Sequence, residues 1–274
     1  MRWKEIFDKV SQEASKAVLS IYRSPAASRV MGRGRSGDIT LWIDALSEQV
    51  IEEALKREIG EDFILISEEA GEKCIGSSPN FIILCDPLDG SHNAWRGIPF
   101  FSISLALIDL EGRFRDVRFG YVRNILTQDT FYAERGGGAY RNGDRLEASA
   151  LDLGIDTIAV ENPSTPLLAE TVSLLKGEGR KVRILGCASL SICLTASGAF
   201  SSAVIGAPGG ARSIDTTAAY IIAKEAGCIV TDDEGLDVGD VRVGIEGRRN
   251  LVVSIDEGVH KRVLEALRCP SSYG

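Results

Sequence analysis

The spacing of the apolar segments changes near residue 150, and this change constrains the fold more than any other feature of the chain. Before it, residues 3–23 and 43–59 have helical spacing, and short apolar runs joined by polar turns follow them. After it, strand-like and helix-like segments alternate as far as residue 268. The first pattern favours helices beside an antiparallel sheet, and the second favours an α/β layer.

We therefore expect an α/β (α+β) protein with two subdomains that pack as one compact unit. The N-terminal α+β subdomain would cover residues 1–150, and the C-terminal α/β subdomain would cover residues 151–274. Neither a linker nor an internal repeat separates them, and 274 residues are enough for such a unit. In the second half we expect a helix over residues 165–177, between strands at 155–162 and 181–186.

The composition excludes several classes of protein. A net charge of −8 argues against binding to nucleic acid or to an anionic membrane, both of which need a basic surface. No window is apolar enough to span a membrane, and the first residues lack the apolar core of a secretory signal. The six cysteines contain no C-x-x-C pair and lie mostly in apolar contexts, which predicts buried thiols in a reducing cytoplasm.

The chain has only two histidines, His92 and His260, which argues against a histidine-based hydrolase. Two histidines are too few for a multi-histidine metal site. We expect His92 in a solvent-facing loop and His260 on the surface of the last helix. Trp42 and Trp95 are expected to pack near a site entrance or in the core.

Acidic residues stand where apolar segments end. Asp86 and Asp89 follow the run "FIILC", with Pro87 between them to favour a turn, and the other acids in comparable places are Glu68, Glu69, Asp44 and Asp215. Clustered carboxylates raise each other's pKa, so a site that gathers them in ionised form needs a cation. Oxygen ligands without His or Cys select Mg²⁺ or a similar hard metal.

The residues after Asp89 suggest a phosphate site. Gly90 and Ser91 offer free backbone N–H groups, and a helix that begins at Ser91 would present its positive end to a phosphate. Metals, acids and a helix start together suit phosphoryl hydrolysis. Taken singly, each acid could instead belong to an ordinary turn or a helix cap.

A glycine-rich segment near the N-terminus suggests a different function. "GRGRSG", residues 32–37, has the letters of a dinucleotide-binding fingerprint. That fingerprint needs a strand before it and a helix after it, whereas here a helix precedes it and an extended segment is expected to follow. We interpret it as a basic surface loop, or as a loop that closes over an anionic substrate. A nucleotide-cofactor oxidoreductase is the alternative that this segment suggests.

The acidic motifs resemble those of a known group. "DPLDGSHN", residues 86–93, is similar to the D-P-[ILV]-D-G-[TS]-x-N signature of the inositol monophosphatase and fructose-1,6-bisphosphatase superfamily. "SEE" at 67–69 and "SIDTTAAYIIAKEAG" at 213–227 resemble its upstream and downstream elements, in the same order. The segment "GDITLWIDALSEQ" looks most like the archaeal branch, some of whose members hydrolyse both inositol phosphate and fructose 1,6-bisphosphate. The resemblance implies a layered αβαβα fold and a Mg²⁺-dependent phosphatase.

The resemblance also implies roles for individual residues. Glu68, Asp86 and the Leu88 carbonyl would hold one metal, and Asp86, Asp89 and Asp215 a second. Glu68 could also touch a third. Two or three Mg²⁺ ions are expected, and Mn²⁺ could replace them. Asp44 and Ser91, in place of the more usual threonine, would orient the attacking water, while Gly90 and Ser91 would bind phosphate. Glu69 would support the site or only form a cap.

Two departures from the family pattern bear on the substrate. Ile214 stands where the family has Trp, which we expect to affect packing, and the loop "GAPGGARS" lacks the glutamate with which inositol-specific members hold ring hydroxyls. Arg212 and Arg183 could instead bind a second phosphate, or form surface ion pairs. The remaining expected sugar contacts are Gly186, Cys187 and Ala188, which open a helix.

The sequence thus predicts a phosphatase for sugar or polyol phosphates, with fructose 1,6-bisphosphate and inositol 1-phosphate as the substrates to test. A phosphatase for 3′-phosphoadenosine 5′-phosphate and a non-catalytic binding relative are the alternatives. The resemblance also implies a homodimer, a state for which the sequence itself carries no signal.

Overall fold

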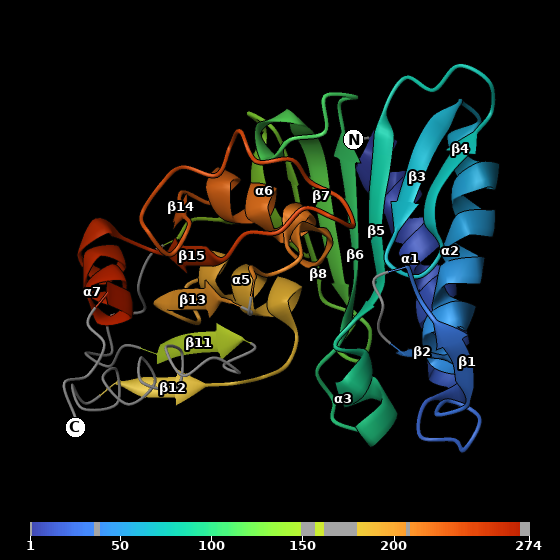
Figure 1. Cartoon of the computed structure of the whole chain (residues 1–274), viewed down its shortest axis with the longest axis horizontal. Coiled ribbons are helices and arrows are strands. Elements are labelled where there is room, and N and C mark those ends of the chain that lie inside the picture. Colours follow the sequence, from blue (N-terminus) through green and yellow to red (C-terminus); the bar gives the residue numbers. More distant parts are fainter. Residues whose placement is uncertain (1, 36–38, 149–156, 162–179, 207–208, 269–274) are drawn as a thin grey trace.

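Five layers make up the fold in the computed structural model, which describes residues 2–35, 39–148, 157–161, 180–206 and 209–268. Helices α1 and α2 cover one face of an eight-stranded sheet, and α5 and α6 lie between that sheet and a five-stranded one (Figure 1). Helix α7 packs on the outer face of the second sheet. This arrangement confirms the expected αβαβα layering. Among the described residues, no helix combines the length and apolarity that crossing a membrane requires.

The N-terminal part of the chain forms the larger sheet, in the order β10-β9-β8-β7-β6-β5-β3-β4. Among its described strands, only β3 and β5 pair in parallel. A separate hairpin, β1–β2, precedes α2. The elements are α1 (Arg2–Ile21), β1 (Val30–Arg33), β2 (Ile39–Leu41), α2 (Trp42–Ile59), β3 (Phe63–Ser67), β4 (Gly71–Ile75), β5 (Ile82–Asp89), α3 (Ser91–Arg96), β6 (Ser102–Ile108), β7 (Val117–Asn124), β8 (Thr130–Glu134), β9 (Gly138–Arg141) and β10 (Asp144–Leu146).

The C-terminal part forms the smaller sheet, in the order β12-β11-β13-β15-β14. Strand β11 runs parallel to both of its neighbours, and β15 is antiparallel to β13 and β14. The elements are β11 (Thr157–Glu161), β12 (Lys181–Arg183), α5 (Ala188–Ala196), β13 (Ser202–Ile205), α6 (Thr217–Glu225), β14 (Ile229–Thr231), β15 (Leu251–Ser254) and α7 (Glu257–Arg268), with short 3₁₀ turns at Phe114–Asp116 and Ser213–Asp215.

Strand β5 is central because both of its faces are buried. Ile83 and Cys85 pack towards α1 and α2, whereas Ile82 and Leu84 pack towards α5 and α6. Successive side chains of a strand point to opposite faces, so a continuous apolar run fits a strand covered on both sides. The end of this strand therefore lies where the helix layers meet the sheet.

Within the described residues, the expected helices and most expected strands are present. The expected helix at 165–177 and the proposed boundary near residue 150 lie outside the described residues. The sequence reading missed β4, which contains Glu72 and Lys73 and has no regular apolar pattern, and the β1–β2 hairpin. That hairpin replaces the strand–glycine loop–helix unit of a dinucleotide site, so the oxidoreductase alternative lacks its structural basis.

Candidate active site

A bulge at the end of β5 places two aspartates on the same side. Asp86 pairs with Ser104 of β6, and Asp89 pairs with Ser102, so three steps on β5 match two steps on β6. Residues three apart in a regular strand point to opposite faces, and one extra residue reverses that relation. The Leu88 N–H donates to Asp86 Oδ1 at 3.0 Å and closes the turn. The expected turn at Pro87 is thus a bulge within the strand.

Three carboxylates from distant parts of the chain meet beside this bulge. Single oxygen atoms of Glu68, Asp86 and Asp215 all lie within 4.8 Å of one another. Glu68 follows β3, Asp86 lies on β5, and Asp215 ends the 3₁₀ turn before α6. They border a cavity of about 170 Å³ that is also lined by Ile39, Glu69, Leu88, Asp89, Gly90, Ser91 and Arg212. The donor set is all oxygen, as a hard divalent cation prefers.

Burial makes this cluster electrostatically costly. Asp86 is 2% exposed. Its pKa is raised well above the usual value, first by burial and then by the charges of Glu68 and Asp89. The pKa of Glu68 is also raised, by burial and by Asp215, while Arg212 opposes the shift. A bound cation would reverse these shifts because it stabilises the ionised carboxylates.

Arg212 supplies a positive charge to the cluster. Its Nη1 lies 2.7 Å from Glu68 Oε1, and its Nε donates to Asp215 Oδ2 at 3.4 Å. The arginine that the sequence offered as a second-phosphate ligand therefore contacts two of the three clustered acids. Its guanidinium lines the same cavity, so it can also reach an anion bound there.

Asp89 has a different set of partners. Its carboxylate accepts hydrogen bonds from Ser189 N at 2.7 Å and Ser189 Oγ at 2.6 Å. Longer bonds come from Ala188 N, at 3.3 Å, and Cys187 Sγ, at 3.1 Å. These donors form the start of α5, so Asp89 caps that helix. The predicted sugar-binding segment 186–188 is thereby fixed against the acidic site.

Asp44 stands in the first turn of α2. It is 3% exposed, and Leu41 N donates to its Oδ2 at 2.9 Å. Burial, more than the neighbouring charge of Glu69, raises its pKa to about 7. No hydrogen bond joins Asp44 to Ser91 within the described residues, so their pairing stays a prediction. Glu69 lines the cavity and accepts a hydrogen bond from Thr40 Oγ1.

The turn after Asp89 is the proposed phosphate-binding segment. Gly90 has a φ of 85°, a conformation that favours glycine, and it lets the chain pass from β5 into α3. A Cβ at Gly90 would lie 3.0 Å from the Gly186 carbonyl oxygen. Gly90 and Ser91 both line the cavity beside the acids.

A family model decides the classification: the inositol monophosphatase family matches residues 3–269. The chain belongs to the inositol monophosphatase family. It is 32% identical over 262 residues to fructose-1,6-bisphosphatase/inositol-1-monophosphatase of Archaeoglobus fulgidus, covering 94% of this chain and 95% of that one. The crystal structure of an inositol monophosphatase–fructose 1,6-bisphosphatase superposes with a TM-score of 0.85 at 27% identity, covering 97% of this chain and all of that one.

A further relative is a bifunctional NADP phosphatase/NAD kinase of Methanococcus maripaludis, 30% identical over 276 residues. The match covers 93% of this chain, which spans about half of that relative (47%). The predicted family and the predicted class of enzyme, a phosphatase that hydrolyses phosphate monoesters, are confirmed by these matches.

Some predicted residues do not reach the cavity of this family member. Arg183 is exposed on β12, and its Nη1 donates to the neighbouring Val182 carbonyl at 3.0 Å. It does not line the acidic cavity, because β12 is the edge strand of the second sheet. Gly186, Cys187 and Ala188 also lie outside the lining, although Cys187 and Ala188 contact Asp89.

Three expectations about single side chains are wrong. His260 is 6% exposed rather than on the surface, and it bonds Thr231 and Ser254 because α7 packs that face on β15. Cys74 is exposed on β4. Trp95 is 38% exposed and lines a different pocket from the acidic one.

The sequence reading missed two residues that support the site. Ser189 is the main partner of Asp89, and Glu161 accepts hydrogen bonds from Gly186 N at 2.7 Å and Ser191 Oγ at 2.6 Å. Ser189 could have been found from the sequence, because a serine near the start of a helix commonly takes part in its cap. Glu161 could also have been found, because it ends the apolar run "TIAV" as the other acids of the site end theirs.

Proposed function

We propose that this chain is a Mg²⁺-dependent phosphatase for sugar or polyol phosphates, with fructose 1,6-bisphosphate and inositol 1-phosphate as substrates. The proposal rests mainly on one observation, the convergence of Glu68, Asp86 and Asp215 within 4.8 Å in a cavity that Gly90 and Ser91 also line. Carboxylates at this spacing suit hard divalent cations, and the adjoining turn offers backbone donors for phosphate.

The three clustered acids would hold the metal, with the Leu88 carbonyl and Asp89 as further ligands. Bound Mg²⁺ would neutralise phosphate oxygens and lower the pKa of the attacking water. Asp89 would need to exchange some of its bonds to Ser189 and Cys187 to become a ligand. Its attachment to the start of α5 would then keep it in place.

Asp44 is proposed as the group that receives the proton from water. Burial raises the pKa of its carboxyl, and a bound cation would lower that pKa and favour the ionised form that can accept a proton. The Ser91 hydroxyl would hold the water in position, and the N–H groups of Gly90 and Ser91 would bind the phosphate. Water is partly excluded from the site because Asp44 and Asp86 are buried.

Arg212 favours a substrate with a second negative group. Arg212 lines the cavity, and its guanidinium could bind a phosphate because phosphate and carboxylate oxygens accept the same paired hydrogen bonds. We therefore propose that fructose 1,6-bisphosphate is turned over at least as well as inositol 1-phosphate. Arg183, by its exposed place on β12, contributes less.

The test is kcat/KM for fructose 1,6-bisphosphate, inositol 1-phosphate, 3′-phosphoadenosine 5′-phosphate and NADP, each with Mg²⁺ and with EDTA. Mg²⁺-dependent release of phosphate from the first two supports the proposal. NADP is included because one relative is named an NADP phosphatase/NAD kinase. A preference for either nucleotide would replace the sugar proposal, and no metal-dependent release from any substrate would favour a non-catalytic relative. A cytoplasmic homodimer is part of the same proposal, and light scattering tests the dimer.

A further inference from the structure

One short segment, residues 185–186, links the second sheet to the proposed phosphate-binding turn. It lies between β12 and α5, yet Leu185 bonds Asn93 of α3, 92 residues away in the sequence. Two buried side chains hold its backbone groups, Asn93 at 7% exposed and Glu161 at 2%. Neither side chain lines the acidic cavity. Both are therefore buried polar groups that lie outside the site but bond a segment beside it.

Asn93 bonds the carbonyl groups of this segment. Its Nδ2 donates to the Leu185 carbonyl at 2.7 Å and to the Phe100 carbonyl, just before β6, at 2.8 Å. A longer contact reaches the Gly186 carbonyl at 3.3 Å. One amide group thus joins α3, the start of β6 and segment 185–186. An aspartate has the same size but, when ionised, has no hydrogen to donate to these carbonyls.

Glu161, at the end of β11, bonds the N–H groups of the same segment. Its carboxylate accepts from Gly186 N at 2.7 Å and from Leu185 N at 3.3 Å. It also accepts from Ser191 Oγ of α5 at 2.6 Å. An ionised carboxylate offers acceptors only, so it suits three donors at once. Asn93 and Glu161 together therefore form a clamp on segment 185–186.

The clamped segment packs tightly against Gly90. A Cβ at Gly90 would lie 3.0 Å from the Gly186 carbonyl oxygen and 3.1 Å from the Phe100 carbonyl oxygen. Both are backbone atoms, and the Phe100 oxygen is one that Asn93 bonds at 2.8 Å. The place of the proposed phosphate-binding turn therefore depends on where these carbonyl groups are held.

The same segment leads directly into the donors that hold Asp89. These donors are Cys187 Sγ, Ala188 N, and Ser189 N and Oγ, at 2.6–3.3 Å from the carboxylate. Gly90 follows Asp89 in the chain, so the segment contacts the turn and the acid before it from one side. A shift of segment 185–186 would move both.

We propose that Asn93 and Glu161 are positioning residues of the proposed active site, because their clamp on segment 185–186 fixes the phosphate-binding turn relative to Asp89. The inference rests on the proposed function, in which Gly90 and Ser91 bind phosphate and Asp89 is a metal ligand. The two residues act through the segment and not by contact with the substrate. A displacement of about 1 Å in groups that position a substrate can lower a rate by about 100-fold.

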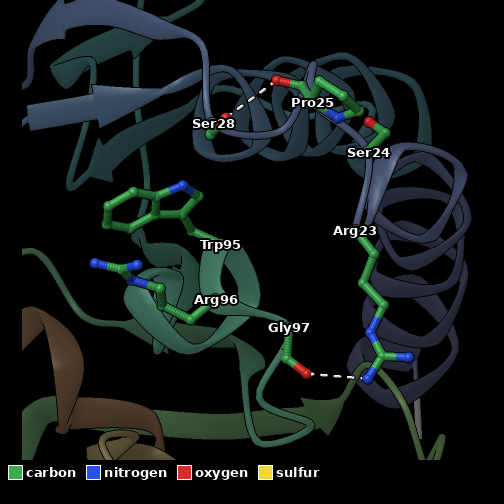
Figure 2. Close-up of a pocket in the computed structure, with 7 residues that line it drawn as sticks. All are labelled: Arg23, Ser24, Pro25, Ser28, Trp95, Arg96 and Gly97. Atoms are coloured by element: carbon green, nitrogen blue, oxygen red, sulfur yellow. Dashed lines mark hydrogen bonds between the residues drawn. The ribbon is translucent and has the colours of Figure 1, made fainter.

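The other end of α3 offers a matched control. Arg23 Nη2 donates to the Gly97 carbonyl at 3.2 Å, as Figure 2 shows, and this bond is exposed. It joins α3 to the loop after α1 without contacting segment 185–186. Arg23 has a φ of 63°, which asparagine adopts more readily than most residues. Arg23→Asn therefore removes the guanidinium without adding backbone strain.

The test compares Asn93→Asp, Glu161→Ala, Glu161→Gln and Arg23→Asn in two measurements. Hydrogen exchange by mass spectrometry in EDTA, on peptides that cover residues 85–97 and 185–191, reports on the clamp without metal or substrate. The kcat and KM for fructose 1,6-bisphosphate and inositol 1-phosphate with Mg²⁺ report on its catalytic role. Both are measured at a temperature at which circular dichroism shows each variant to be folded. Asn93→Asp and Glu161→Gln keep the test decisive if Glu161→Ala does not fold.

We expect Asn93→Asp and Glu161→Ala to speed exchange in both peptides and to lower kcat by about 10- to 100-fold. The KM should change by less than about threefold, because the loss concerns the alignment of the reacting groups. Glu161→Gln keeps an oxygen that can accept from Gly186 N, so it should lose less than Glu161→Ala. Arg23→Asn should leave kcat and the exchange of residues 185–191 unchanged.

Two results would overturn the positioning role while leaving the proposed function intact. Unchanged exchange in Asn93→Asp would show that no clamp exists. Faster exchange with unchanged kcat would show that the clamp is structural only. If the unsubstituted protein releases no phosphate, the proposed function itself fails, and the positioning role fails with it.

Discussion

Arg212 Nη1 lies 2.7 Å from Glu68 Oε1, and the same guanidinium reaches Asp215 Oδ2 through Nε at 3.4 Å. One arginine therefore bridges two of the three carboxylates that would hold a metal. Its charge compensates part of the repulsion in the cluster before any metal binds. A metal and Arg212 would then stabilise the same acids. With a metal bound, Arg212 would contribute less to the stability of the protein.

Replacing Arg212 with Gln should destabilise the metal-free protein, because Glu68 and Asp215 lose their positive neighbour. Both side chains of the Arg212–Glu68 pair are largely buried, so we expect a loss of about 2 kcal/mol in the free energy of unfolding. Urea denaturation in EDTA measures it, and Arg212→Lys is the control that keeps the charge. Saturating Mg²⁺ should recover most of the loss. An equal loss with and without Mg²⁺ would show that Arg212 does not compensate the cluster.

Asp89 should have a structural role that Asp86 lacks. Asp89→Ala removes four hydrogen bonds from the start of α5, and relief of repulsion with Asp86 offsets part of that loss. We expect a net destabilisation of about 1–2 kcal/mol in EDTA. Ser189→Ala, which removes one donor, should cost about half as much. Unchanged stability of Asp89→Ala would mean that the cap contributes nothing.

Glu161 should make stability depend on pH. Burial raises its pKa from 4.5 to about 7 in the folded protein. An acid with a raised folded pKa stabilises the fold fully below the unfolded pKa, and that contribution is lost as the pH rises from about 4.5 to 7. The loss is up to about 3 kcal/mol.

Glu161→Gln, which cannot ionise, should not show this loss. Relative to the unsubstituted protein, the variant should therefore be more stable at pH 8 than at pH 5, which means a larger free energy of unfolding. Urea denaturation in EDTA at both pH values measures the difference. A difference that does not change with pH would contradict the assignment of Glu161 as the titrating group.

The sequence predicted the helices, the strands and the acidic set because these depend on local patterns, whereas the αβαβα layering was implied by the family resemblance. Strand β5 is a continuous apolar run with acids at its end, and Asp215 directly precedes an apolar helix. These patterns place Asp86 and Asp215 at the edge of the core whatever the tertiary arrangement of the segments. The family resemblance then related the motifs to one another from the first helix to about residue 235.

Contacts between distant segments could not be predicted in this way. The bonds from Ser189 to Asp89 join residues 100 apart, and the position of Arg212 beside Glu68 depends on how the two sheets meet. For the same reason, the sequence could not show that Arg183 lies away from the cavity. Its strand, β12, is an edge strand of the second sheet. Strand β4 was missed since its polar letters carry no alternating pattern.

The most direct test of the proposed function is Mg²⁺-dependent phosphate release from fructose 1,6-bisphosphate by Asp86→Asn. Asn keeps the acceptor for Leu88 N but removes the charge from the most buried acid of the cluster. Relief of repulsion should leave the metal-free variant at least as stable as the unsubstituted protein, so that loss of activity cannot be attributed to unfolding. We predict that kcat/KM falls by more than about 100-fold. A folded Asp86→Asn variant with unchanged activity would contradict the proposal that this cluster is the metal-binding catalytic centre.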